Sequence, residues 1–187
     1  MTTTSRLLAL LLSITLASCA SVGSGSKAEK QKSIREMKDN TLTQLFRLKP
    51  DTRSQLSSAP GYAVFSNVNV NIILFAAGTG YGLVKDNRSG ADTYMNMAEG
   101  GLGLGAGAKD YRIVMVFHTP DALDQFLNSG WTFGGNADAA LKANDKGGSV
   151  EGEAYFGNTT VYTFTESGIA LQATVKGTRF WADGALN

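Results

Sequence analysis

Alternate glycines between residues 99 and 110 raise the first question about chemistry in this sequence. The stretch EGGLGLGAGAKD has glycine at positions 101, 103, 105 and 107, and glycine-rich loops cradle phosphate groups in nucleotide-binding proteins. Such a loop needs the spacing G-x-G-x-x-G between a strand and a helix, or a glycine-lysine pair followed by serine or threonine. Here the period is two, and KDYRIVMVFHT follows with the composition of another strand. We therefore predict a strand over 101–108 that curves a sheet, a turn at Lys109-Asp110, and no nucleotide site.

A catalytic or metal site that uses histidine would depend on one residue. His118 is the only histidine of the chain, and neither the ligand spacing of a zinc site nor that of a Ser-His-Asp set accompanies it. The acidic residues are scattered along the sequence. We expect His118 to lie in a loop, and we predict no catalytic residue, no bound metal and no cofactor.

The single cysteine stands in a more informative context. MTTTSRLLALLLSITLASC has one positive charge at Arg6, an apolar run from Leu7 to Leu16 and then small residues. This run is too short to span a bilayer, which takes roughly 20 residues, but it suits the core of a secretory signal. LASC resembles the lipobox of bacterial lipoproteins, in which the cysteine takes a diacylglycerol and becomes the new N-terminus. We expect residues 1–18 to be a signal peptide and Cys19 to be lipidated.

The lipid would also set the location of the protein. Each buried methylene adds about 0.8 kcal/mol, one acyl chain holds only reversibly, and two or more give stable anchoring. Lipoproteins resembling this one, with no aspartate directly after the cysteine, go to the outer membrane of Gram-negative cells; here Ala20 follows. We expect a lipid-anchored envelope protein at the outer membrane, facing the periplasm.

Basic residues concentrate behind this anchor. Residues 20–53 carry eight basic and four acidic side chains, whereas residues from 54 onward carry eight basic and twelve acidic ones. The whole chain has a formal charge of only +1, which argues against a nucleic-acid binder. We predict a flexible tether over 19–32 and a basic arm that attracts anionic phospholipid. The expected lipid-binding residues are Lys27, Lys30, Lys32, Arg35, Lys38, Arg47 and Lys49.

Between Ser33 and Leu48 the apolar residues recur with the period of a helix. Ile34, Met37, Leu42, Leu45 and Phe46 are spaced three and four apart up to Leu48, and Pro50 ends this helix or begins a short second one through Leu56. The stripe either lies on a membrane surface or packs on the domain. The lysines before the stripe are compatible with both, because the tether could touch lipid while the helix packs.

The remaining sequence favours strands. One further helix is well delimited, with Thr119 as cap, Pro120 in the first turn and Gly130 at the end. The run from Ile72 to Ala77 is too short to span a membrane, and we interpret it as a strand buried on both faces, the alternative being a membrane-inserting tip. The predicted class is α+β with β dominant: a strongly curved antiparallel sheet or partial barrel, an N-terminal helical arm and one short packed helix. Strands are expected at 61–66, 70–77, 79–85, 92–98, 101–108, 112–117, 131–134, 150–156, 159–165 and, with a break, 169–182.

The order of these segments resembles the SYLF domain, a family of bacterial exported proteins and of eukaryotic proteins linked to phosphoinositides and actin. The matching stretches cover nearly everything from residue 40 to the end, and residues 33–187 are expected to form the domain. They are PGYAVFSNV (60–68), GTGYGLV (78–84), GGLGLGAGAKD (100–110), IVMVFHTPDALDQFL (113–127), WTFGGNADAA (131–140) and SGIALQATVKG (167–177).

The resemblance implies lipid binding through the N-terminal helical region in the eukaryotic branch and an envelope role in the bacterial branch, without catalysis. After FSNV many relatives continue with a lysine and paired glycines, whereas NVNIILFAAG is found here, which counts against phosphoinositide recognition. We therefore expect a non-enzymatic envelope lipoprotein whose domain binds anionic phospholipid. The alternative is a structural or interaction module that binds an envelope protein, with the lipid setting only its location.

Overall fold

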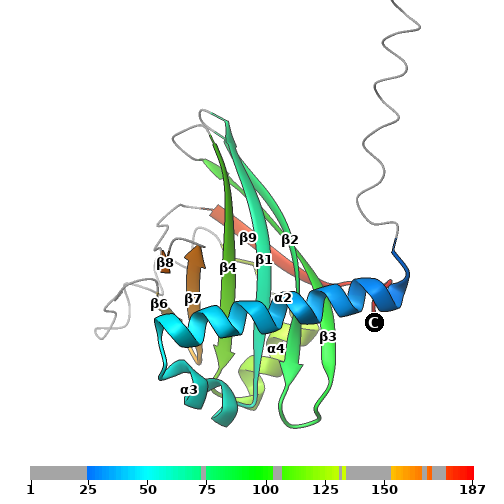
Figure 1. The fold of residues 1–187 in the computed structure, drawn as a ribbon, viewed down its shortest axis with the longest axis vertical. Coiled ribbons are helices and arrows are strands. Elements are labelled where there is room, and N and C mark those ends of the chain that lie inside the picture. Colours follow the sequence, from blue (N-terminus) through cyan, green and yellow to red (C-terminus); the bar gives the residue numbers. More distant parts are fainter. Residues whose placement is uncertain are drawn as a thin grey trace, which may run out of the picture.

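The frame of the fold is one antiparallel sheet with helices against both of its faces (Figure 1). The computed structural model describes residues 25–72, 75–102, 107–130, 132–133, 153–165, 168–169 and 176–187. The predicted signal peptide and Cys19 therefore lie outside the described residues. The helices are α2 (Lys27–Leu48), α3 (Thr52–Ser58) and α4 (Pro120–Ser129). The strands are β1 (Gly61–Ile72), β2 (Phe75–Asp86), β3 (Asp92–Leu102), β4 (Gly107–Phe117), β5 (Thr132–Phe133), β6 (Glu153–Phe156), β7 (Thr159–Thr165), β8 (Gly168–Ile169) and β9 (Lys176–Ala182).

The strand order is β5-β9-β3-β2-β1-β4-β7-β6, with β8 paired to β7, and neighbouring strands run antiparallel. The described part of β5 does not pair with that of β6, so the sheet is not closed. This confirms the predicted α+β class with a dominant, open antiparallel sheet.

The sheet curls so strongly that distant strands meet. Phe65 on β1 and Phe180 on β9 are separated by β2 and β3, so a flat sheet would hold their backbones about 14 Å apart. Their ring centroids are nevertheless only 4.7 Å apart. Gly82 of β2 pairs with Phe65, and a Cβ at position 82 would lie 2.5 Å from the Phe65 ring. The ring therefore lies over a glycine backbone, which leaves it room to reach β9.

Two apolar layers result from this curl. The inner, concave face packs against α4 through Leu123 and Phe126. The outer face packs against α2 through Ile34, Leu42 and Leu45, which are all buried. The apolar stripe predicted in the sequence is therefore the face that packs α2 on the sheet, and this packing occupies the side chains that a membrane-surface helix would need.

Helix α2 begins earlier than predicted. Residues 27–32 belong to the helix and not to a flexible tether. The reason is a capping box: the Ser26 hydroxyl accepts from the Glu29 backbone N–H at 3.3 Å, and the Glu29 carboxylate accepts from the Ser26 N–H at 2.7 Å. The polar, small-residue composition before Ser33 hid this start. Helix α4, in contrast, has the predicted cap at Thr119, Pro120 in its first turn and Gly130 at its end.

The strands predicted over 61–66 and 70–77 are wrong in their boundaries. Strand β1 continues to Ile72 and β2 begins at Phe75, which is paired with Ile72. The apolar run from 72 to 77 therefore spans the β1–β2 connection and is not one strand buried on both faces. Polar residues did not end β1, because it is paired along nearly its whole length to β2 and β4. Residues 73 and 74, the centre of the alternative membrane-inserting tip, lie outside the described residues.

The separate strand predicted over 101–108 is also wrong. Gly101 lies in β3 and Gly107 in β4, while 103–106 lie outside the described residues. The predicted turn at Lys109-Asp110 is inside β4, where these residues pair with Asn69 and Val68 of β1. Lysine and aspartate at these positions favoured a turn, but pairing with β1 along the whole of β4 keeps them in an extended strand. The strand predicted at 159–165 is β7 with the same bounds, and the segments predicted at 79–85, 92–98 and 112–117 lie within β2, β3 and β4. Of 131–134 and 150–156, the structure describes 132–133 in β5 and 153–156 in β6. Residues 168–169 and 176–182 lie in two separate strands, β8 and β9.

Candidate functional site

Helix α2 carries the predicted basic residues across the outer face of the sheet (Figure 1). Lys27, Ile34, Lys38, Leu45 and Lys49 follow one another at intervals of seven and four residues, so they share one face of the helix. Leu45 is completely buried on that face. Three of the predicted lipid-binding lysines therefore point toward the domain.

Four of the predicted residues make contacts within the domain. Lys27 Nζ donates to the Asn187 carbonyl at 2.8 Å, and Arg35 donates to the Tyr94 hydroxyl. Lys38 forms a 2.9 Å ion pair with Asp39, and its side chain is only 17% exposed. Lys49 Nζ lies 5.5 Å from the centre of the Tyr162 ring. Lys27, Arg35 and Lys49 therefore contact parts of the domain outside α2, whereas the Lys38 ion pair lies within the helix.

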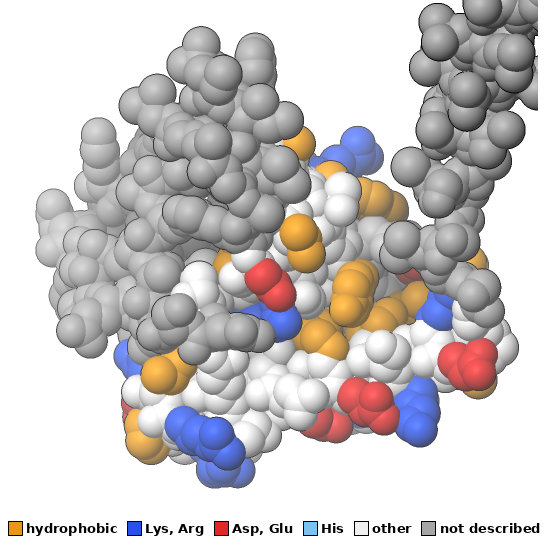
Figure 2. Space-filling model, turned by 45° about the horizontal axis from the view of Figure 1, so that its top comes forward, with side chains coloured by type: hydrophobic (Ala, Val, Ile, Leu, Met, Phe, Trp, Pro, Cys, Tyr) orange, Lys and Arg blue, Asp and Glu red, His pale blue; other side chains and the backbone are white. Residues whose placement is uncertain are grey.

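Lys27, Lys30, Lys32 and Arg47 are exposed. Lys32 and Glu36 are 3.8 Å apart on the helix surface, and such an exposed pair contributes little. Figure 2 shows basic and acidic side chains interspersed along the helix edge of the molecule. The structure therefore brings only part of the predicted basic set to the surface, and the set does not form one patch.

An apolar surface that sequence reasoning missed lies on the sheet beside α2. Tyr81 of β2 and Trp181 of β9 belong to one row across the sheet, in which Ser66, Tyr81, Asn96 and Trp181 are successive partners. Val68 lies two residues beyond Ser66 on the same face of β1. Val68 is 53%, Tyr81 44% and Trp181 40% exposed. We call these three residues the outer shelf.

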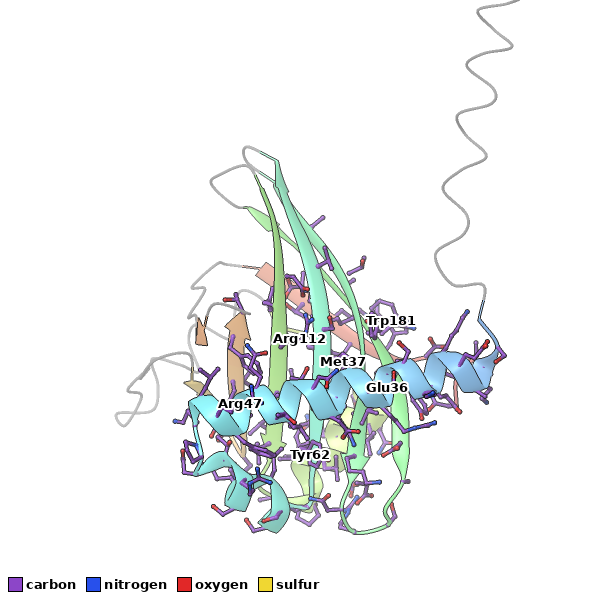
Figure 3. All side chains as sticks on the ribbon, viewed as in Figure 1. Glu36, Met37, Arg47, Tyr62, Arg112 and Trp181 are labelled. Atoms are coloured by element: carbon purple, nitrogen blue, oxygen red, sulfur yellow. The ribbon has the colours of Figure 1, made fainter. Side chains whose placement is uncertain are left out.

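The figures show how the outer shelf is framed. In Figure 2 apolar side chains gather on the sheet above the helix. Figure 3 shows Trp181 and Arg112 above α2, with Met37 at the helix edge and Tyr62 on the other side of α2. Arg112 forms an ion pair with Asp110. A sequence signal for the shelf did exist, because Tyr81 is a single large side chain between Gly80 and Gly82.

The inner face holds a buried polar cluster at the end of its apolar core. The Asn67 side-chain amide donates to the Tyr111 hydroxyl at 2.6 Å, and the Thr178 hydroxyl donates to Glu99 Oε1 at 3.2 Å. Tyr111 also shares a hydrogen bond with the Glu99 carboxylate. The cluster therefore ties together β1, β4, β3 and β9, which is the group of strands that the curl brings close.

Tyr111 makes the stability of this cluster dependent on pH. Burial, followed by the nearby Glu99 charge, raises the pKa of Tyr111 above its ordinary value of about 10. The unfolded chain therefore releases the proton at lower pH than the folded chain does. The contribution is fully present below about pH 10 and is lost as pH rises toward the folded pKa. The free energy of unfolding of the wild type should therefore fall as pH rises above about 10. In Tyr111→Phe this fall should be smaller. Urea titrations at stepwise higher pH measure the free energy of unfolding of both proteins. An identical slope in both proteins would contradict the prediction.

His118 lies between β4 and α4, as expected of a loop histidine, and its Nε2 is 2.6 Å from the Thr160 hydroxyl. Within the described ranges, no group of three or more His, Cys, Asp or Glu side chains could hold a metal ion. None of the helices that the structure describes combines the length and apolarity needed to cross a membrane.

These features define a class of protein: an α+β domain whose curled, open sheet encloses an apolar core, with a long helix and an exposed apolar surface on its outer side. Residues 98–187 match the family model Ysc84, described as Las17-binding protein actin regulator. This match confirms the resemblance to the SYLF family that the sequence motifs indicated.

A relative supports this assignment over a longer stretch. The chain is 29% identical over 158 residues to Beta cell expansion factor A of Aeromonas veronii. The match covers 84% of this chain and 59% of that protein, so the chain spans about three fifths of the relative's length.

Proposed function

We propose that this chain is a non-enzymatic lipoprotein of the bacterial envelope, anchored through Cys19, whose SYLF domain binds anionic phospholipid at the membrane surface. The supporting observation is that helix α2 begins at Lys27, eight residues after Cys19, and has Lys30, Lys32 and Arg47 exposed. A lipid on Cys19 would hold these cations close to the head groups. The outer membrane, on its periplasmic side, is the proposed location.

The contribution of the basic side chains to the free energy of membrane binding can be estimated. A cation near an anionic surface is worth up to about 1 kcal/mol, and a membrane rich in phosphatidylglycerol or cardiolipin supplies such a surface. Arg35, Lys38 and Lys49 are partly buried, and the exposed Lys27 donates to the Asn187 carbonyl. These four cations therefore contribute less than Lys30, Lys32 and Arg47. Added salt weakens all of these attractions.

Vesicle sedimentation of the chain carrying Cys19→Ser measures this contribution without the anchor. Changing Lys30, Lys32 and Arg47 together to Gln should lower the partition coefficient on phosphatidylglycerol vesicles on the order of 10- to 100-fold at low salt. The matched control exchanges the same residues as Lys30→Arg, Lys32→Arg and Arg47→Lys, which keeps the charge and should bind like wild type. Equal binding of wild type to neutral and anionic vesicles would reject the basic contribution.

A protein partner is the second candidate, and the family description as a Las17-binding protein actin regulator favours it. In this case the lipid sets only the location of the domain. Crosslinking in intact cells that recovers one stoichiometric envelope protein, together with no vesicle binding of the Cys19→Ser chain, would support the partner over the phospholipid.

A further inference from the structure

The outer shelf has the composition of a surface that meets a membrane interface. Tryptophan and tyrosine combine an apolar ring with a polar group and are enriched where hydrocarbon meets water. Val68, Tyr81 and Trp181 come from β1, β2 and β9, so only the folded sheet assembles them. Of the large apolar side chains that the structure describes as exposed, Leu48 on α2 is the one outside this group.

Cationic side chains lie at the borders of the outer shelf. Arg179 is exposed two residues before Trp181, on the same face of β9. On helix α2, Lys30 lies one heptad before Met37 and therefore on the same flank, which borders the shelf (Figure 3). Lipid phosphates attract such cations at the rim of an apolar contact.

The anchor would approach the domain from this side. The first turn of α2 lies beside the C-terminus, where Lys27 Nζ contacts the Asn187 carbonyl and Gln31 donates to the Leu186 carbonyl at 2.7 Å (Figure 1). The C-terminal residues follow directly on β9, the strand of Trp181. Even fully extended, the seven residue steps from Cys19 to Ser26 span at most about 25 Å. A lipidated Cys19 would therefore keep the Trp181 end of the outer shelf close to the bilayer.

We propose that the outer shelf is the part of the domain that rests on the bilayer, with Trp181, Tyr81 and Val68 entering the head-group layer and Arg179 and Lys30 contacting lipid phosphates. The inference rests on the proposed phospholipid binding and adds the surface and the orientation. In this orientation α2 lies alongside the membrane surface while its apolar stripe remains packed on the sheet.

Tryptophan fluorescence tests the contact directly. In the Cys19→Ser chain, Trp131→Phe leaves Trp181 as the one tryptophan. Vesicles containing phosphatidylglycerol should shift the Trp181 emission to shorter wavelength, and brominated acyl chains should quench it. An emission that is unchanged while the protein sediments with the vesicles would overturn the proposed contact.

Binding variants provide the second readout. Tyr81→Ser with Trp181→Ser should weaken partitioning by about tenfold or more, because two exposed aromatic anchors are lost. Tyr81→Phe with Trp181→Phe is the matched control, since it keeps an aromatic ring at both positions of the outer shelf, and it should bind like wild type. Thermal melts establish that each variant is folded.

The outcomes separate the two proposals. If the Cys19→Ser chain binds no vesicle of either composition, the proposed phospholipid binding fails, and this inference fails with it. If wild type binds and the double variant binds equally well, only the outer shelf is rejected. If the double variant instead abolishes a dimer seen by analytical ultracentrifugation without changing vesicle binding, the shelf is a contact between copies, which also overturns the inference.

Discussion

Gly82→Ala is expected to destabilise the domain by about 3 kcal/mol or more, because the new methyl group has no space. A Cβ at position 82 would lie 2.1 Å from the Val64 carbonyl oxygen and 2.5 Å from the Phe65 ring. Either β2 would have to move away from β1, or the Phe65 ring would have to leave its contact with Phe180. Both changes would open the curl that encloses the inner core.

Thermal unfolding measures this effect with a matched control. For a domain of this size about 3 kcal/mol corresponds to a fall in Tm of roughly 6–12 °C. Gly100→Ala adds the same methyl group to a glycine of β3 that has no atom within 4 Å of the new position, and it should change stability by no more than about 0.5 kcal/mol. Equal melting temperatures for the two variants would refute the role assigned to Gly82.

Leu45→Ala is expected to cost about 2–5 kcal/mol, the range observed for buried leucines that leave a cavity. Leu45 is completely buried between α2 and the sheet, in a cluster with Val64, Val114 and Tyr162. Its loss removes the centre of the contact that holds α2 on the domain. Hydrogen exchange should also become faster along α2 in this variant.

Leu48→Ala provides the control on the same helix. Leu48 is 39% exposed, so its truncation should cost less than about 1 kcal/mol. Urea titration of both variants without any lipid gives the difference directly. Similar small losses in both would mean that the apolar stripe of α2 does not hold the helix on the sheet in solution.

The two glycine-rich strands illustrate what period alone can and cannot predict. Alternate glycines correctly indicated extended backbone at positions 101 and 107 and a curved sheet. The ends of the strands were missed, because β1 pairs with two neighbours over its length and this pairing carried polar residues such as Asn69 through the ladder. The composition of a segment indicates its own preference for strand or turn. Where a strand ends depends instead on the neighbouring strands with which it pairs.

The candidate surface depended even more on long-range structure. Helix spacing already implied that Lys38 shares a face with Leu45. How far the sheet would bury that face could not be predicted from the sequence. The outer shelf combines positions 68, 81 and 181, which are brought together by strand register. No local pattern connects Val68 with Trp181, so this surface could not be predicted.

The sequence by itself determined the elements whose causes are local: the cap and end of α4 at Thr119 and Gly130, the apolar stripe of α2, the β-rich class and the family motifs. The tertiary structure alone decided which cations are exposed, why Gly82 must lack a side chain, and where apolar residues gather on the surface. The physical reason is that caps and periods act between residues a few positions apart. Curl, burial and surface composition instead depend on contacts between strands that are distant in the chain.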